Sequence, residues 1–188
     1  MKRNIERKLY LHHFRAIIHA ISTYDDLNVL ISHLTEGTGR RFKAKGSCIL
    51  LLDERDGQLY HVGSYGISDE YINKGPIFLD EKHSALHKGE PVFIENMQTD
   101  QRVQYPQAAA KEGIVSMLSI PINCRQAVIG VIRLYHDQPR RIHEEDIESL
   151  CVMSELLGLV IENNGLKNFL EGVWTSLESL PPRILKGI

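Results

Sequence analysis

Features that mark several protein classes are scarce in this sequence of 188 residues. Its three cysteines, Cys48, Cys124 and Cys151, are odd in number and widely spaced, so neither a disulfide framework nor a zinc knuckle is expected. No apolar run approaches the roughly 18 to 20 residues that span a bilayer, and the charged start lacks the apolar stretch of a signal peptide. We therefore expect a protein of the reducing cytoplasm that does not enter a membrane.

An excess of one charge is also lacking. The 22 Lys and Arg residues nearly balance the 24 Asp and Glu residues, so we predict no nucleic-acid partner. A hydrophobic content of 43% is typical of a globular protein with a packed interior. The length suits one domain with helical extensions better than a two-domain enzyme.

Apolar residues at three- and four-residue spacing predict helices near both ends of the chain. The first helix is expected over about residues 5–21 and the second over 27–42. A long helix opens with three carboxylates at 144–146, which suit the positive end of a helix dipole, and its apolar stripe continues until Pro181-Pro182. We therefore divide the chain into an N-terminal helix (1–24), a central domain (25–164) and a C-terminal helical extension (165–188).

The second half of the long helix lies beyond the predicted core. An exposed apolar stripe of that length needs a partner, so we expect a homodimer through the terminal helices. The residues expected in this dimer helix are Phe169, Leu170, Val173, Trp174 and Leu177.

Between the helices the apolar period becomes that of strands. Residues 47–53 and 58–65 predict one hairpin around Asp56-Gly57, and residues 116–122 and 127–135 predict a second. Shorter extended and helical pieces lie between the hairpins. This order of elements predicts an α+β fold with a central antiparallel sheet of about five or six strands.

Several segments, in order, resemble the GAF domain family. The stretch from Ser47 to Gly66 resembles its first hairpin, residues 89–97 its middle strand, and residues 100–122 its loop, helix and following strand. Residues 129–134, 139–147 and 161–163 are similar to its closing strand and helix. The resemblance implies a PAS-related sheet with a helical layer on one face and short helices and loops on the other.

The resemblance also implies a regulatory module without catalysis, which binds a small ligand or relays a signal through dimeric helices to an output domain or partner protein. The sequence names neither ligand nor cofactor. The family's cyclic-nucleotide signature is not found, and no cysteine is followed by the His that is common at bilin attachment sites. Two alternatives stay open: a ligand-free dimerisation scaffold, and a pocket redox enzyme similar to the free methionine sulfoxide reductases. Cys124, the one cysteine expected to be exposed, would be its thiol.

Nine histidines raise the question of a metal site. His83 and His87 have the spacing that places two imidazoles on one helix face, but no third ligand is fixed nearby. We therefore predict no metal site, and no catalytic residues.

Side-chain alternation along the strands, combined with the family's geometry, indicates the pocket. The faces that carry polar residues are the better candidates, because the opposite faces are more uniformly aliphatic and suit the helical layer. Aromatic residues of the variable segment are expected to close the pocket. The predicted pocket residues are His61, Tyr65, Tyr71, Phe78, Tyr105, Ser119, Arg133 and Tyr135.

Overall fold

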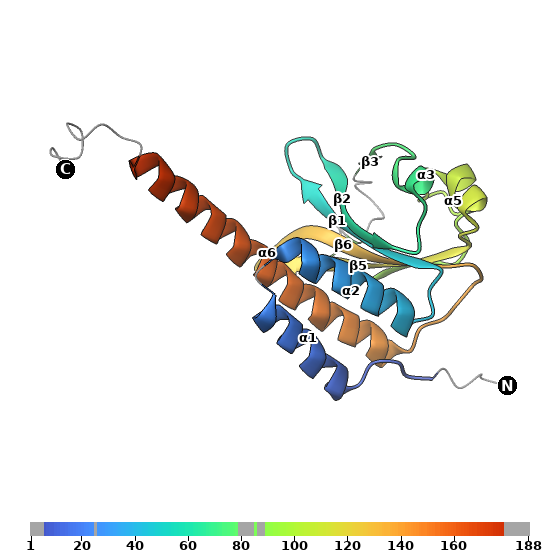
Figure 1. The fold of residues 1–188 in the computed structure, drawn as a ribbon. Helices are drawn as coiled ribbons and strands as arrows, with labels where there is room; N and C mark the ends of the chain where they lie inside the picture. Colours follow the sequence, from blue (N-terminus) through green and yellow to red (C-terminus); the bar gives the residue numbers. More distant parts are fainter. Residues whose placement is uncertain (1–5, 25, 79–84, 86–88, 179–188) are drawn as a thin grey trace.

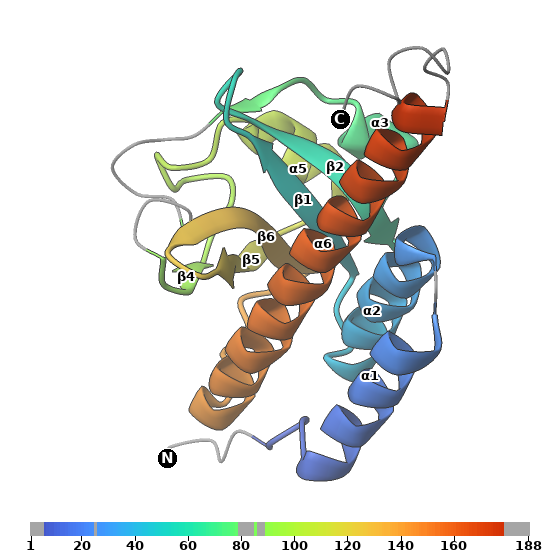
Figure 2. The ribbon, with the colours of Figure 1, turned by 90° about the vertical axis from the view of Figure 1, so that its left-hand side faces the viewer.

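The computed structural model describes residues 6–24, 26–78, 85 and 89–178. Its centre is an antiparallel sheet of six strands in the order β3-β2-β1-β6-β5-β4. Figure 1 shows the sheet, and β4 is labelled in Figure 2. The α+β fold and the strand number are as the sequence predicts. The strands are β1 (Gly46–Asp53), β2 (Gln58–Tyr65), β3 (Ile77–Phe78), β4 (Val92–Ile94), β5 (Ser116–Cys124) and β6 (Ala127–His136).

Helices lie on both faces of the sheet, but unequally. Figures 1 and 2 show α1 (Leu11–Thr23), α2 (Leu27–Arg41) and α6 (Glu144–Glu178) together on one face. The short helices α3 (Asp69–Ile72) and α5 (Pro106–Glu112) lie beyond the other face. The expected division into a helical layer and a layer of short elements is therefore found.

Each face of the sheet has its own core. On the helical side, aliphatic residues of β5 and β6 pack with α2 and α6 because alternate side chains of a strand point to one face. The fully buried members from these two strands are Leu118, Ile120, Ile122, Ile132 and Leu134. The other core contains Cys48, Tyr71, Met117 and Tyr135, so it is mixed in chemistry.

The first helix starts later than predicted. Residues 6–10 are not helical, and α1 begins at Leu11. The buried Asp146 of α6 accepts hydrogen bonds from the backbone N–H groups of Lys8 and Leu9, at 2.7 to 2.9 Å. These amide groups satisfy a carboxylate at the start of α6, which holds the preceding segment outside a helix.

The last helix runs unbroken over 35 residues, through the poor helix formers Asn163, Asn164 and Gly165. Its first half packs on the sheet and its second half projects beyond the body of the molecule (Figure 1). The predicted end at Pro181-Pro182 lies outside the described residues. Within the described ranges, no helix is long and apolar enough to cross a membrane.

Candidate functional site

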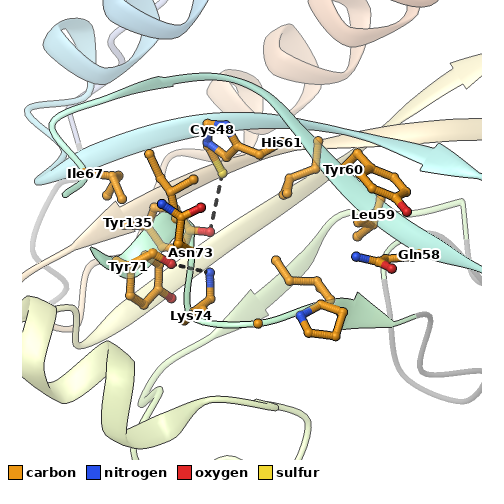
Figure 3. A pocket seen from close by; sticks show the side chains of 15 residues that line it. Cys48, Gln58, Leu59, Tyr60, His61, Ile67, Tyr71, Asn73, Lys74 and Tyr135 are labelled. Carbon is orange, nitrogen blue, oxygen red and sulfur yellow. Dashed lines mark hydrogen bonds between the residues drawn. The ribbon is translucent and has the colours of Figure 1, made fainter. Parts of the chain in front are cut away.

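A hollow of about 480 Å³ opens on the sheet face that α1, α2 and α6 leave free. It lies between strands β1, β2 and β6 on one side and α3 with the turn after it on the other (Figure 3). A second hollow of about 70 Å³ adjoins it and shares Tyr71, Lys74 and Ile77. The main hollow is lined by Cys48, Leu50, residues 58–61, Ile67, residues 71–77 and Tyr135.

Two tyrosines and a cysteine form the buried base of the site. The rings of Tyr71 and Tyr135 meet edge to face, with centroids 5.7 Å apart. The Tyr135 hydroxyl lies 3.4 Å from Cys48 Sγ (Figure 3). Burial raises the pKa of Tyr71 to about 12 and also raises the pKa values of Tyr135 and Cys48. All three groups are therefore protonated and neutral near pH 7.

Lys74 follows α3 and points back over it. Its Nζ donates a hydrogen bond of 2.9 Å to the Tyr71 carbonyl and lies 3.9 Å from the centroid of the Tyr71 ring (Figure 3). Burial lowers the pKa of Lys74 to about 8, so most of its charge remains at pH 7.

Two further polar side chains reach the site from the sheet. Arg133 of β6 lines the smaller hollow, and His61 of β2 lines the larger one. Arg133 Nε and His61 Nε2 are buried without a hydrogen-bond partner among the described residues. Burial lowers the pKa of His61, so its imidazole is neutral near pH 7. The site therefore combines two cations, neutral donors and apolar walls.

The structure brings most of the predicted pocket residues together. His61, Tyr71 and Tyr135 line the main hollow, and Phe78, Tyr105 and Arg133 line the smaller one. Ser119 pairs with Arg133 across β5 and β6 but lines neither hollow.

Tyr65 is the exception, because it lies on the opposite face of the sheet. Leu50 pairs with His61 and Ile49 with Gly63, so Val62 is an extra residue that forms a β-bulge. The bulge reverses the alternation beyond it. Tyr65 consequently packs against α2, where the Arg40 guanidinium lies 5.3 Å from the centre of its ring. The prediction that Tyr65 lines the pocket is wrong.

The cysteines do not form a reactive group. Cys124, expected to be exposed, is buried beside α6, with its Sγ 3.5 Å from a carboxylate oxygen of Glu162. Burial, and then the Glu162 carboxylate, raise the pKa of Cys124. Burial also raises the pKa of Cys151, on α6. Cys124 is thus a protonated thiol on the helical side of the sheet, away from the hollow.

Sequence reasoning missed Lys74 and Cys48 as site residues. Lys74 stands in the irregular stretch before Gly75-Pro76, where no periodicity indicates a direction. Cys48 belongs to an apolar run without alternation, so its face could not be read. His83 and His87 lie outside the described residues. Within the described ranges, no three His, Cys, Asp or Glu residues group as a metal site would require.

A comparison with known families decides the relationship. The sequence model of the GAF domain matches residues 25–162. This chain belongs to the GAF domain family. No curated protein sequence matches the chain.

Solved GAF structures share the fold. The GAF domain of a phosphoenolpyruvate-protein phosphotransferase from Acinetobacter is 22% identical with a TM-score of 0.71, over 84% of this chain and 96% of that one. The corresponding domain from Coxiella burnetii is 14% identical with a TM-score of 0.74, over 84% and 95%. The free methionine-R-sulfoxide reductase of Neisseria meningitidis is 14% identical with a TM-score of 0.68, over 87% and 98%. At these identities the likeness concerns the fold alone.

Proposed function

We propose that this GAF chain is a non-catalytic signalling module that senses a small ligand in the hollow above the sheet and relays the signal through a dimer of α6. The observation that carries the proposal is the hollow itself. Its volume of about 480 Å³ falls in the range of small-molecule sites, and its apolar walls carry a few convergent polar groups. Ligand binding acts on a relay only through different affinities for two arrangements of the helices.

The hollow favours a sensor over the two alternatives. A ligand-free scaffold would fill this space with its own side chains, as protein interiors are close-packed. A redox enzyme that works through a pocket cysteine needs a reactive thiol there. Here the pocket cysteine, Cys48, has its pKa raised by burial, and Cys124 faces α6.

The dimer proposal rests on the exposed stripe of α6. Four of the five residues expected in the dimer helix are exposed: Phe169 by 68%, Leu170 by 56%, Val173 by 38% and Trp174 by 66%. The side chain of Leu177 lies outside the described residues. Leu11 and Ile18 of α1 present further exposed apolar side chains. Apolar surface of this extent on a projecting helix is typical of an interface.

Native mass spectrometry of the purified protein, before and after denaturation, tests ligand binding. We expect an extra mass that is lost on denaturation and that is absent from Ile77→Trp, in which the larger side chain fills the hollow. Phe93→Trp is the matched control, because Phe93 is exposed on β4 and lines neither hollow. An adduct retained by Ile77→Trp, or no adduct and no stabilising metabolite for the natural chain, would contradict the sensor.

Light scattering tests the dimer separately. Val173→Glu is expected to give monomers, because the substitution puts a charge into the proposed interface. Asn168→Glu changes the same helix outside the apolar stripe and is expected to leave the dimer intact. Monomers of the natural chain, or an unchanged mass for Val173→Glu, would overturn this part of the proposal.

A further inference from the structure

We propose that the hollow binds a small organic oxyanion, a ligand with a carboxylate or phosphate group, which Lys74 and Arg133 hold while its apolar body fills the main hollow. This inference rests on the proposed function and names the chemical class of the ligand.

The first step is the charge of the walls. None of the described residues that line the two hollows is Asp or Glu, whereas Lys74, Arg102 and Arg133 are among them. Arg102 is paired with Asp100. Lys74 and Arg133 form no ion pair with any carboxylate in the described part of the chain. Glu112 of α5, which accepts hydrogen bonds from Ser68, acts electrostatically on Lys74 but forms no ion pair with it. Because partly buried cations without a paired carboxylate are unfavourable, the site is complementary to an anion.

The second step is the position of the cations. Lys74 lines both hollows, and Arg133 lines the smaller one beside it. An oxyanion at this junction meets the Lys74 ammonium group and the buried Nε–H of Arg133, which has no other partner in the described residues. A guanidinium group and an ammonium group are the donors that proteins use for carboxylates and phosphates.

The third step concerns the rest of the ligand. Leu50, Ile67 and Ile77 form apolar walls, and the Tyr71 and Tyr135 rings close the base. Because the phenols and the Cys48 thiol are protonated near neutral pH, they repel no anion. The walls therefore suit an apolar or aromatic body that ends in an oxyanion.

Three probes of the same shape separate charge from shape. Benzoate, phenyl phosphate and uncharged benzamide are titrated at constant ionic strength, and the thermal midpoint Tm and the Arg133 Nε–H signal in 1H–15N NMR spectra are followed. We expect benzoate or phenyl phosphate to raise Tm and shift the Arg133 signal, and benzamide to do neither. The stronger of the two anions identifies the oxyanion.

Variants of Lys74 test whether the anionic probes bind at the proposed place. Lys74→Met is expected to weaken binding of the anions about tenfold or more, since a charge-assisted hydrogen bond is lost. Its Tm without probe is expected to be equal or higher, because the substitution removes a desolvated cation. Lys74→Arg keeps the charge and should retain binding. A structural role for Lys74 would instead lower the Tm of Lys74→Met and leave the probe shifts unchanged.

The outcomes separate the two proposals. If benzamide binds as well as benzoate, the hollow is still a ligand site and only the anion class is wrong. If no probe binds and Ile77→Trp also leaves the native mass spectrum unchanged, the sensor proposal fails as well. Anion effects that persist in Lys74→Met with an unmoved Arg133 signal would place the anion elsewhere and overturn the inference.

A second inference rests on a different observation, the heptad spacing along α6. Apolar residues exposed by 48%, 53%, 53% and 38% recur every seven residues, at Val152, Leu159, Leu166 and Val173. Four residues after each of the first three stand Leu156, Asn163 and Leu170. These are the d and a positions of a coiled coil, with one polar Asn at an a position.

From this spacing we infer that two copies of α6 form a parallel, in-register coiled coil, with Asn163 of the two copies opposite each other. In a parallel pair, each g residue faces the e residue five positions later in the other copy. Phe169 then faces Trp174 of the second copy, whereas Glu162, also at a g position, is paired with Arg125 of its own chain. The pair of Phe169 and Trp174 is aromatic, so the surface complements itself in this register.

Disulfide cross-linking tests the orientation. Leu159→Cys and Val173→Cys are made as separate single variants, and each is expected to oxidise to a covalent dimer. Only a parallel, in-register pair brings both of these positions next to their own copies, because an antiparallel pair does so only at its dyad. Asn168→Cys, on the outer side of the helix, is the control expected to stay uncross-linked. Cross-linking at one position alone, or at neither, would overturn the register.

Asn163 gives an independent test. Asn163→Asp places two like charges at the coiled-coil axis and is expected to raise the dimer dissociation constant about tenfold or more. Asn164→Asp is the matched control on the adjacent position and should change the constant little. Equal effects of the two substitutions would contradict the placement of Asn163.

Discussion

The two faces of the sheet are made by the same strands but differ in chemistry. On the face that α2 and α6 cover, β5 and β6 contribute only aliphatic side chains to a core whose members are almost completely buried. On the other face, the alternate positions carry Met117, Arg133 and Tyr135, and two polar atoms at the site have no partner among the described residues. Both faces have a buried core, but the face with the hollow has more unpartnered polar atoms among the described residues and more unfilled space.

This difference explains how one sheet serves two purposes. Unpartnered polar groups are unfavourable, so they persist where another requirement outweighs their cost. Of the three such side-chain atoms in the described part of the chain, those of His61 and Arg133 lie beside the hollow, and that of His136 lies on the helical side. Substitutions on the two faces should therefore have unequal consequences.

The largest expected effect is on the helical face. Ile120→Ala removes a fully buried side chain and is expected to lower the free energy of unfolding by about 3 kcal/mol, through lost burial and a residual cavity. The same substitution at half-buried Ile77, beside the hollow, should cost about 1 kcal/mol or less because space already exists there. Urea unfolding measures both. Equal losses would remove the energetic distinction between the faces.

Acid sensitivity is expected next, from His136, which alternates with Ile132 and Leu134 along β6. Burial, and then nearby Arg140, lower the pKa of its imidazole to about 4, against an ordinary value of 6.5. The unfolded chain therefore binds more protons between pH 4 and 6.5. Stability that is complete above pH 6.5 should fall by about 3 kcal/mol as the pH drops to 4.

The comparison of His136→Gln with the natural chain isolates this group. Unfolding free energies are measured at intervals from pH 7 to pH 4, and the variant is expected to show a shallower fall. The test uses only the change of the unfolding free energy with pH. Any loss of stability that the substitution causes at pH 7 does not affect it. Parallel slopes for the two proteins would show that His136 does not titrate as described.

The smallest expected effects come from single polar groups. Ser47 Oγ donates a hydrogen bond of 2.6 Å to the Thr35 carbonyl on the helical side, so Ser47→Ala should cost about 1 kcal/mol. His61→Leu removes an imidazole whose Nε2 has no partner in the described part of the chain, and it should change stability by less than about 0.5 kcal/mol or raise it. Thermal unfolding of the two variants measures both changes in stability. A larger loss for His61→Leu would show that this residue contributes to the fold.

Much of the fold could be predicted from the sequence, because regular alternation fixes which side chains share a face. Along β5 and β6 no bulge separates the site positions, so Arg133 and Tyr135 were correctly placed opposite the helical layer. Along β2 the same rule failed at Tyr65, since one inserted residue, Val62, reverses every later side chain. A local pattern does not reveal a bulge that depends on the pairing with β1.

Specific side-chain contacts account for the other differences between the predicted and the observed structure. The helix expected from about residue 5 starts at Leu11, because Asp146, far along the chain, takes the amide groups of Lys8 and Leu9. Lys74 could not be assigned to the site because its direction is set by the Tyr71 carbonyl and ring. The partner of Lys8 and Leu9 is remote in the sequence, whereas that of Lys74 is three residues away in a stretch without periodicity.

The pKa of Lys74 tests most directly whether the hollow on this face of the sheet binds an anion, as we propose. Around this ammonium group lie Tyr71 of α3, Cys48 of β1, His61 of β2, Arg133 of β6 and Glu112 of α5. An NMR titration of the Lys74 side chain, assigned by comparison with Lys74→Met, gives its pKa with and without benzoate. We predict a pKa of about 8 in the free protein and a clear rise when benzoate binds. An ordinary pKa near 10.5 that benzoate does not change would contradict the account.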